Sequence, residues 1–194
     1  MVSDMYRINE IFSSLQGEGF WTGTPMVFIR FSGCNLQCPF CDTDHSGSVE
    51  MAVEDIVSES LRIGNGCGRV CVTGGEPSLQ LDAVLVEALH DAGFRVHAET
   101  NGTRPLPDGI DWVTLSPKSD VPGLKGDGTV VLTGADEVKI VYLGADVERW
   151  ASFPALWHFL QPCSCENTEK TTAYILAHPH WRLSLQTHKY LNIR

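Results

Sequence analysis

The strongest constraint on this chain is a loop with three cysteines that directly follows a predicted strand. Residues 26–31 are rich in β-branched and aromatic side chains, which favours a strand. Cys34, Cys38 and Cys41 come next, at the spacing C-x3-C-x2-C. Cysteine thiolates hold iron–sulfur clusters, and a cubane cluster normally has four of them as ligands. Three cysteines in one loop therefore predict a [4Fe–4S] cluster with one iron open to a small molecule.

Two other interpretations of this loop stay open at this point. A zinc site normally has four protein ligands, often as two pairs at C-x2-C spacing. In the second interpretation, the three thiols bind no metal and are simply buried side chains. Of the other cysteines, Cys71 lies in an apolar run and predicts a buried packing role. Cys163 and Cys165 are candidates for a second metal or cluster site.

Strands and helices alternate along the rest of the chain. Apolar runs bounded by Gly, Pro and Asp predict further strands over residues 69–73, 95–99, 111–115, 137–142, 157–160 and 182–186. Apolar residues at a helical period predict helices over residues 52–61, 81–92 and 170–178. Residues 6–12 predict one extra strand before the cysteine loop. This alternation is typical of parallel βα units.

The length of the chain decides between a full and a partial barrel. A complete (β/α)8 barrel needs roughly 250 residues, and this chain has 194. We therefore predict an α/β fold, a single domain over residues 1–194. It should be an open, partial TIM-type barrel of about six parallel strands, with fewer helices than a full barrel. Gly- and Pro-rich loops should replace the helices after the third and fourth parallel strands.

Chemically unusual residues gather after the predicted strands. They occupy residues 34–41, 74–77, 99–101 and 116–118, Gln161, and residues 186–189. In barrels of parallel strands, the carboxyl ends of the strands form the catalytic face. Packing alone does not explain six such segments at one rim, so we expect an active site there.

Composition excludes several classes of partner. The formal net charge is −10, and nucleic-acid binding depends on Lys and Arg, so we expect no nucleic-acid partner. No apolar run reaches the roughly 20 residues that cross a bilayer, and we expect no membrane partner. The first four residues contain no basic segment leading into an apolar one, which predicts no secretory signal. We expect a cytoplasmic location, where thiols stay reduced.

Two motifs together resemble the radical S-adenosylmethionine (SAM) enzymes. The cysteine loop has an aromatic residue, Phe40, just before its third cysteine, and residues 73–77 read Thr-Gly-Gly-Glu-Pro. The resemblance implies that SAM chelates the open iron of the cluster. It also implies that Gly74, Gly75 and Glu76 bind SAM, whose ammonium group needs carbonyl and carboxylate acceptors. Ser116 and Lys118 would hold its carboxylate or ribose, although a solvated turn is the alternative for these two.

Further motifs, in order along nearly the whole chain, resemble the 7-carboxy-7-deazaguanine synthases within that superfamily. They are Ser-Leu-Gln-Gly-Glu-Gly at 14–19, Arg30, Asp-Thr at 42–43, Glu-Thr-Asn-Gly at 99–102 and Gln-Thr-His-Lys at 186–189. The resemblance implies conversion of 6-carboxy-5,6,7,8-tetrahydropterin to 7-carboxy-7-deazaguanine with loss of ammonia, in 7-deazapurine and queuosine biosynthesis. It implies hydrogen abstraction at C6 by a radical derived from SAM, and ring contraction assisted by Mg2+.

The same resemblance assigns residues and partners. Thr43 would ligate Mg2+, and the substrate would contact Leu15, Gln16, Glu18, Arg30, Glu99, Gln186 and His188. A carboxylate such as Glu18 suits the amino-pyrimidinone edge, and Arg30 with His188 suits the substrate carboxylate. The alternatives are a solvated Glu18, a structural ion pair for Arg30, a packed surface His188 and a helix-capping Thr43. A flavodoxin or ferredoxin-type electron donor and a homodimer are implied as well.

Two other function classes remain to be separated. A glycyl-radical-enzyme activating protein uses the same cluster loop but acts on a protein, so it needs an open face and a docking surface. A non-catalytic metal-binding or redox module would not cleave SAM when reduced. The predicted set of Glu18, Arg30 and His188 favours a small, polar, acidic substrate instead.

Overall fold

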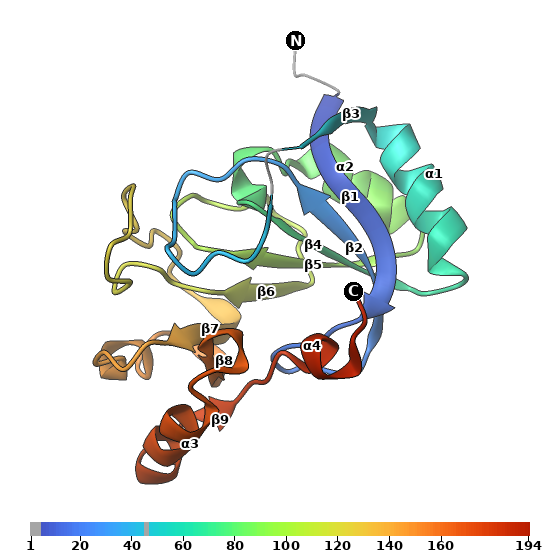
Figure 1. The fold of residues 1–194 in the computed structure, drawn as a ribbon. Helices are drawn as coiled ribbons and strands as arrows, with labels where there is room; N and C mark the ends of the chain where they lie inside the picture. Colours follow the sequence, from blue (N-terminus) through green and yellow to red (C-terminus); the bar gives the residue numbers. More distant parts are fainter. Residues whose placement is uncertain (1–4, 45–46) are drawn as a thin grey trace.

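The computed structural model describes residues 5–44 and 47–194. The N-terminal expectation on a secretory signal concerns residues 1–4, which lie outside this part of the chain. The described residues form one curved sheet with the strand order β3-β1-β2-β4-β5-β6-β7-β8-β9 (Figure 1). In chain order these strands are β1 (Met5–Leu15), β2 (Pro25–Phe31), β3 (Val49–Ala52), β4 (Arg69–Gly74), β5 (Arg95–Thr100), β6 (Trp112–Leu115), β7 (Ala135–Tyr142), β8 (Ala155–Pro162) and β9 (Arg182–Leu183).

The sheet is the predicted partial barrel with an antiparallel extension. Strand β2 pairs in parallel with β4, and β4 through β9 each pair in parallel with the next strand. Strand β1 pairs antiparallel with both β2 and β3. The sequence predicted the strand β1 but not β3, which is only four residues long and has no fully buried residue. The predicted last strand over 182–186 is shorter than expected, because β9 ends at Leu183.

Two helices cover the outer face of the first half of the sheet, as Figure 1 shows. Helix α1 (Val53–Gly64) turns Ile56 inward, and α2 (Ala83–Asp91) turns Leu85 and Leu89 inward. These side chains pack against outward-facing residues of the strands, such as Val27 and Ile29 of β2. The side chain of Asp82 caps α2 by accepting a hydrogen bond from the Leu85 backbone N–H at 3.1 Å.

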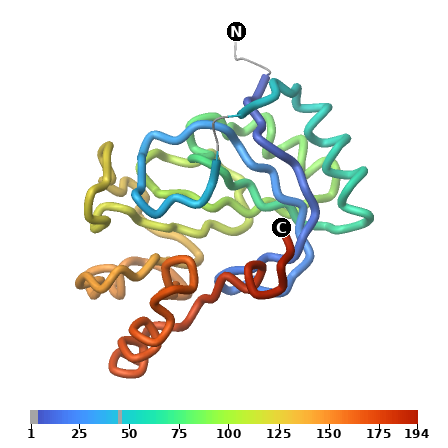
Figure 2. The backbone as a smooth tube through the Cα atoms, in the orientation of Figure 1, coloured from blue at the N-terminus to red at the C-terminus, as the bar shows by residue number. Residues whose placement is uncertain are grey.

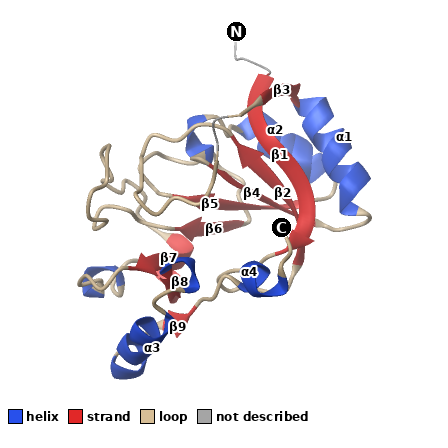
Figure 3. Ribbon diagram, in the orientation of Figure 1, coloured by secondary structure: helices blue, strands red, loops and turns tan. Residues whose placement is uncertain are grey.

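The second half of the sheet has its own outer core. Val138 and Ile140 of β7 and Leu160 of β8 pack there with Trp181 and with residues of α3 (Thr168–Ala177). No helix follows β5 or β6 in the described chain, and Figure 3 shows loops there. This confirms the predicted gap. Helix α4 (Thr187–Leu191) lies near the C-terminus, directly after the predicted strand 182–186, and the sequence did not predict it.

The loop between β1 and β2 bridges the open side of the barrel. The edge strands β3 and β9 do not pair. Instead, the Gly17 carbonyl accepts a hydrogen bond from the Thr187 backbone N–H at 2.9 Å. Phe20, from the same loop, stacks with its ring centroid 5.1 Å from those of both Trp112 and Trp157. The tube in Figure 2 shows the C-terminal segment running beside the first strands. Among the described residues, no helix is both long enough and apolar enough to cross a membrane.

Candidate active site

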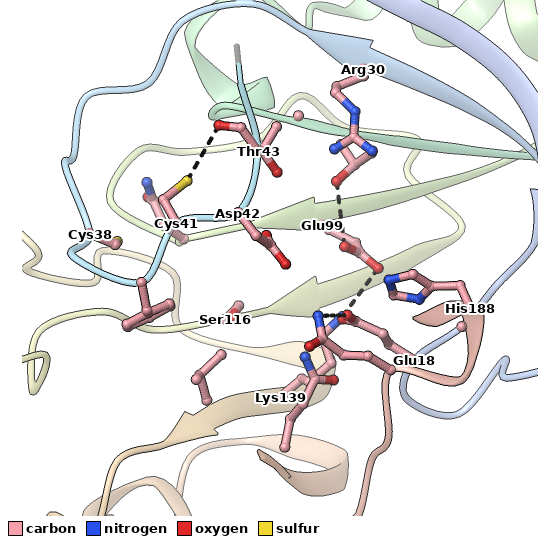
Figure 4. A pocket seen from close by; sticks show the side chains of 18 of the residues that line it. Glu18, Arg30, Cys38, Cys41, Asp42, Thr43, Glu99, Ser116, Lys139 and His188 are labelled. Carbon is pink, nitrogen blue, oxygen red and sulfur yellow. Dashed lines mark hydrogen bonds and ion pairs between the residues drawn. The ribbon is translucent and has the colours of Figure 1, made fainter. Parts of the chain in front are cut away.

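One cavity of about 470 Å³ opens where the carboxyl ends of the parallel strands meet. Every residue that the sequence singled out for cluster, SAM, Mg2+ or substrate lines this cavity: Leu15, Gln16, Glu18, Arg30, Cys34, Cys38, Cys41, Thr43, Gly74, Gly75, Glu76, Glu99, Ser116, Lys118, Gln186 and His188. Figure 4 shows ten of the lining residues with labels, drawn from several strands and loops. The structure thus brings the candidates together, and their individual roles remain predictions.

The cysteine loop forms one wall of the cavity. Gln37 of this loop pairs with Lys125, which lies between β6 and β7, through two backbone hydrogen bonds of 2.9 and 3.2 Å. Cys34 and Cys38 are half-buried, and Cys41 is exposed. Burial raises the pKa of the Cys34 and Cys38 thiols. Three soft sulfur donors on one loop, facing a cavity, fit a cubane cluster whose iron would deprotonate them.

The Gly-Gly-Glu-Pro loop directly contacts the start of the cysteine loop. The Gly75 N–H donates to the Phe31 carbonyl at 3.0 Å, and the Glu76 N–H donates to the Gly33 carbonyl at 2.9 Å. A Cβ atom at Gly75 would lie 1.9 Å from the Gly33 carbonyl oxygen. Gly75 is therefore required for contact between two loops of the protein, in addition to any contact with SAM.

Glu76 is almost completely buried and anchors the loops around it. Its carboxylate accepts hydrogen bonds from the Ser78 backbone N–H at 3.0 Å, the Thr100 hydroxyl at 2.7 Å and the Asn101 backbone N–H at 2.7 Å. A carboxylate has about four lone-pair sites, so one acceptor position remains. Elsewhere in the cavity lining, Lys118 Nζ donates to both the carbonyl and the hydroxyl of Ser116 at 2.6 Å. Ser116 and Lys118 are thus bonded to each other, and both are partly exposed.

A charged network crosses the floor of the cavity (Figure 4). Lys139 Nζ lies 2.5 Å from Glu18 Oε2 and 3.2 Å from Glu99 Oε1. Gln16 Nε2 donates to Glu99 at 3.0 Å. Burial opposes the charge on Glu18, but the ammonium of Lys139 and the hydrogen bond from Gln186 outweigh it and lower the pKa of Glu18 to about 2. Glu18 is therefore a buried, ionised group and not a solvated loop residue.

Gln186 carries an unpaired acceptor at this floor. Its Nε2 donates to Glu18 Oε1 at 2.9 Å. Its Oε1 is buried and has no hydrogen-bond partner among the described residues. A buried polar atom without a partner is costly. Gln186 lines the cavity, so a molecule bound there is a candidate donor for this oxygen.

Arg30 and His188 lie at the side of the cavity near the chain's C-terminus. Arg30 Nε pairs with Glu10 at 2.9 Å, and its guanidinium lies 5.6 Å above the Phe12 ring. This is the structural ion pair that the sequence left as an alternative, but it uses only one edge of the guanidinium. A Cβ atom at Gly17 would lie 2.1 Å from His188 Nδ1. The glycine of the Ser-Leu-Gln-Gly-Glu-Gly motif therefore makes room for the imidazole.

Thr43 and its neighbour Asp42 lie between the cysteine loop and the C-terminal helix. Both line the cavity, and Asp42 pairs with Lys189 at 2.7 Å. In the described part of this segment, residues 41–44, no residue is helical. Hydroxyl and carboxylate oxygens are ligands that suit a hard cation such as Mg2+. The donor set therefore fits a weak magnesium site completed by substrate and water.

Lys139 lines the cavity, and the sequence analysis did not single it out. It lies within the predicted strand 137–142 and is buried in the structure. The pattern Glu137-Val138-Lys139-Ile140 places charged residues alternately inside an otherwise apolar strand. Because side chains alternate across a sheet, this pattern indicates that one face of β7 lines a polar interior. That alternation was the sequence signal by which Lys139 could have been found.

Comparisons with known proteins decide the family. The model of the Radical SAM superfamily matches residues 28–122. A 7-carboxy-7-deazaguanine synthase of Bacteroides thetaiotaomicron is 54% identical over 190 residues, which cover 98% of this chain and 100% of that protein. The chain belongs to the 7-carboxy-7-deazaguanine synthase family.

Further relatives agree with this assignment. A 7-carboxy-7-deazaguanine synthase of Caulobacter vibrioides is 42% identical over 214 residues, covering 97% of this chain and 99% of that protein. The crystal structure of QueE from Escherichia coli superposes with a TM-score of 0.77 at 30% identity and covers 93% of each chain. Membership in the 7-carboxy-7-deazaguanine synthases confirms the partial-barrel fold, the radical SAM enzyme class, and the [4Fe–4S] cluster and SAM as cofactors. It does not favour a glycyl-radical-enzyme activating protein.

Proposed function

We propose that the cavity described above is the site at which this chain converts 6-carboxy-5,6,7,8-tetrahydropterin to 7-carboxy-7-deazaguanine, with loss of ammonia. The observation that carries this assignment to the cavity is the unpaired Gln186 Oε1 beside the ionised Glu18. Together they present acceptors to a ligand that brings several N–H donors. The amino-pyrimidinone edge of a pterin has that pattern.

The cofactor end of the cavity is formed by the cysteine loop and the loop after β4. Cys34, Cys38 and Cys41 would hold the cluster, and the backbone around Gly74 and Gly75 with Glu76 would bind the ammonium group of SAM. When bound, the cluster and SAM supply the hydrogen abstraction that starts the reaction. The chain's own contribution is to place substrate C6 within reach of SAM and to keep water away from the reacting atoms.

The carboxylate of the substrate would be held at the other end of the cavity by Arg30 and His188. The free edge of the Arg30 guanidinium can donate two parallel hydrogen bonds to a carboxylate. Arg30 Nε keeps its ion pair with Glu10, which fixes the orientation of the guanidinium. Mg2+, bound through Thr43 with Asp42 beside it, would polarise the substrate oxygens. Gln16 and Glu99, which are hydrogen-bonded to each other, would contact the pterin ring at the floor of the cavity.

The experiment that tests this function is anaerobic turnover with reductant, SAM and Mg2+. Wild-type protein should form the deazaguanine from 6-carboxytetrahydropterin. Arg30→Ala or His188→Ala should weaken substrate binding by roughly tenfold to a hundredfold, the value of a charge-assisted hydrogen bond. SAM binding should stay close to normal. Arg62→Ala, which changes an exposed arginine on α1, should leave turnover unchanged.

A substrate analogue without the carboxylate separates a direct contact from a structural effect. It should bind wild type poorly and lose little more in either variant, because its partner charge is already absent. An equal loss for the analogue and the true substrate would mean that Arg30 and His188 act structurally. Absence of any product from wild-type protein would overturn the function itself.

We also infer the wider setting of this enzyme. Its substrate is a small molecule, and radical SAM chemistry requires an electron donor, for which a flavodoxin or ferredoxin-type protein is the proposal. A homodimer and a single domain over residues 1–194 are proposed on family resemblance and on the continuous sheet. A cytoplasmic location is proposed because none of the seven cysteines forms a disulfide and an exposed cluster needs a reducing compartment.

A further inference from the structure

Lys139 is a buried ammonium group on the floor of the cavity, and none of the roles above uses it. Along β7, Val138 and Ile140 face the outer hydrophobic core. Lys139 faces the other side of the sheet and lines the cavity, with only 5% of its side chain exposed. Figure 4 shows it beneath Glu18, on the same side of the cavity. A lysine is almost never buried to this degree unless it is paired.

Carboxylates from three separate segments surround this ammonium. Glu18 lies in the loop between β1 and β2, Glu99 in β5, and Glu137 in β7 two residues before Lys139. Burial alone would lower the pKa of Lys139, but the charges of these carboxylates outweigh it and raise the pKa above its ordinary value. The carboxylates therefore favour the charged form of Lys139, which can only donate hydrogen bonds.

One of the three N–H donors of Lys139 has no protein partner. Its Nζ donates to Glu18 Oε2 and to Glu99 Oε1. It makes no other hydrogen bond among the described residues. A buried donor that borders a cavity favours a ligand that offers an acceptor there. The unpaired acceptor of Gln186 lies on the other side of Glu18. The floor therefore presents acceptors on Gln186 and Glu18 followed by a donor on Lys139.

This order of groups matches one edge of the proposed substrate. The amino-pyrimidinone edge of a pterin carries an amino group, then a ring N–H, then the carbonyl oxygen at C4. The amino group and the ring N–H can donate to Gln186 and Glu18. The C4 oxygen then needs a donor, since a carboxylate would repel it. Lys139 is the cation next to Glu18 that can supply that donor.

We propose that Lys139 is a substrate-contacting, specificity-determining residue that donates a hydrogen bond to the C4 carbonyl oxygen of the pterin. The inference rests on the proposed function, because it assumes that a pterin occupies the cavity. It goes beyond that function by assigning recognition of the oxo group to a residue of β7. A purely structural lysine would only neutralise Glu18 and Glu99 and would not distinguish one acceptor at C4 from another.

The test uses a substrate pair that differs only in the acceptor at C4. The 4-thio analogue of 6-carboxytetrahydropterin keeps the ring N–H and the amino group but replaces the oxygen with sulfur, a weaker acceptor. Affinities for both compounds would be measured by anaerobic titration calorimetry on the holoenzyme with SAM and Mg2+, without reductant, so that no turnover occurs. The variants are Lys139→Met and, as a matched control, Lys170→Met, which changes an exposed lysine of α3.

Wild type and Lys170→Met should prefer the oxo compound by about tenfold, a fraction of the value of a hydrogen bond to a charged group. Lys139→Met should bind both compounds more weakly and with nearly equal affinity. If Lys139→Met retains the tenfold preference, or if wild type has none, the proposal is wrong. Should Lys139→Met not fold because two carboxylates lose their partner, Lys139→Met/Glu99→Gln removes one of those charges and is read in the same way. Failure of the proposed function would appear separately, as a wild type that makes no product.

Discussion

Replacing Gly75 with alanine should separate the two loops that build the cofactor end of the cavity. The added Cβ would lie 1.9 Å from the Gly33 carbonyl oxygen and 2.5 Å from the Gly33 carbonyl carbon. These are backbone atoms, so no side-chain rotation can relieve the overlap. An ordinary contact of about 3.4 Å or more requires the loop to move by more than about 1 Å. That movement breaks the hydrogen bonds from Gly75 to Phe31 and from Glu76 to Gly33, which are 3.0 and 2.9 Å long.

The cost of this change follows from those contacts. Two backbone hydrogen bonds contribute about 1 kcal/mol each, and forcing an extra methyl group into a packed site costs about 1–3 kcal/mol. Together they lower the free energy of unfolding by about 3–5 kcal/mol. For a chain of this size, this corresponds to a fall of roughly 6–20 °C in the unfolding midpoint. SAM affinity should fall as well, because Glu76 moves with the loop.

Gly68→Ala is the matched control for this experiment. Nothing lies within 4 Å of a Cβ atom built at Gly68, and its φ is outside the left-handed region. Thermal unfolding of both variants, followed by circular dichroism under anaerobic conditions, gives the comparison, and equilibrium SAM binding gives the functional readout. If Gly75→Ala unfolds within about 2 °C of Gly68→Ala and binds SAM equally well, Gly75 is not required for the contact between the two loops.

Three further outcomes are expected. Burial and the nearby charge of Arg69 lower the pKa of His97 to about 4, so the folded state resists protonation that the unfolded state accepts near pH 6.5; in urea unfolding, this one group should contribute about 3 kcal/mol of the stability that wild type loses between pH 6.5 and 4, and His97→Phe should lack that part of the loss. Thr43→Ala should weaken Mg2+ stimulation of turnover while SAM affinity is kept, and equal Mg2+ dependence in both proteins would remove Thr43 from the metal site. Joint replacement of Cys34, Cys38 and Cys41 by alanine should abolish iron binding on anaerobic reconstitution; wild type should hold about four irons per chain, whereas about eight would place a second cluster at Cys163 and Cys165.

Several parts of the fold were predictable because they depend on local patterns. Apolar runs of β-branched residues identified the parallel strands within a few residues, and the helical period identified α1, α2 and α3. Strand β3 was not predictable, because a run of four residues is too short to show a strand pattern of its own, and β3 is held by pairing with β1. The bridging of the barrel by the loop after β1 was not predictable either, since it depends on contacts with residues near the opposite end of the chain.

By itself, the sequence determined which motifs meet at the site. Parallel strands bring their carboxyl ends to one rim, so motifs that follow different strands converge whatever the details of packing. Only the tertiary structure decided how these residues are paired. Lys139 lies 121 residues from Glu18 in the chain, and the Arg30–Glu10 pair depends on the register of β1 against β2. Spacing within a motif reports local geometry alone, whereas hydrogen bonds between distant segments depend on which strands become neighbours and which face each side chain takes.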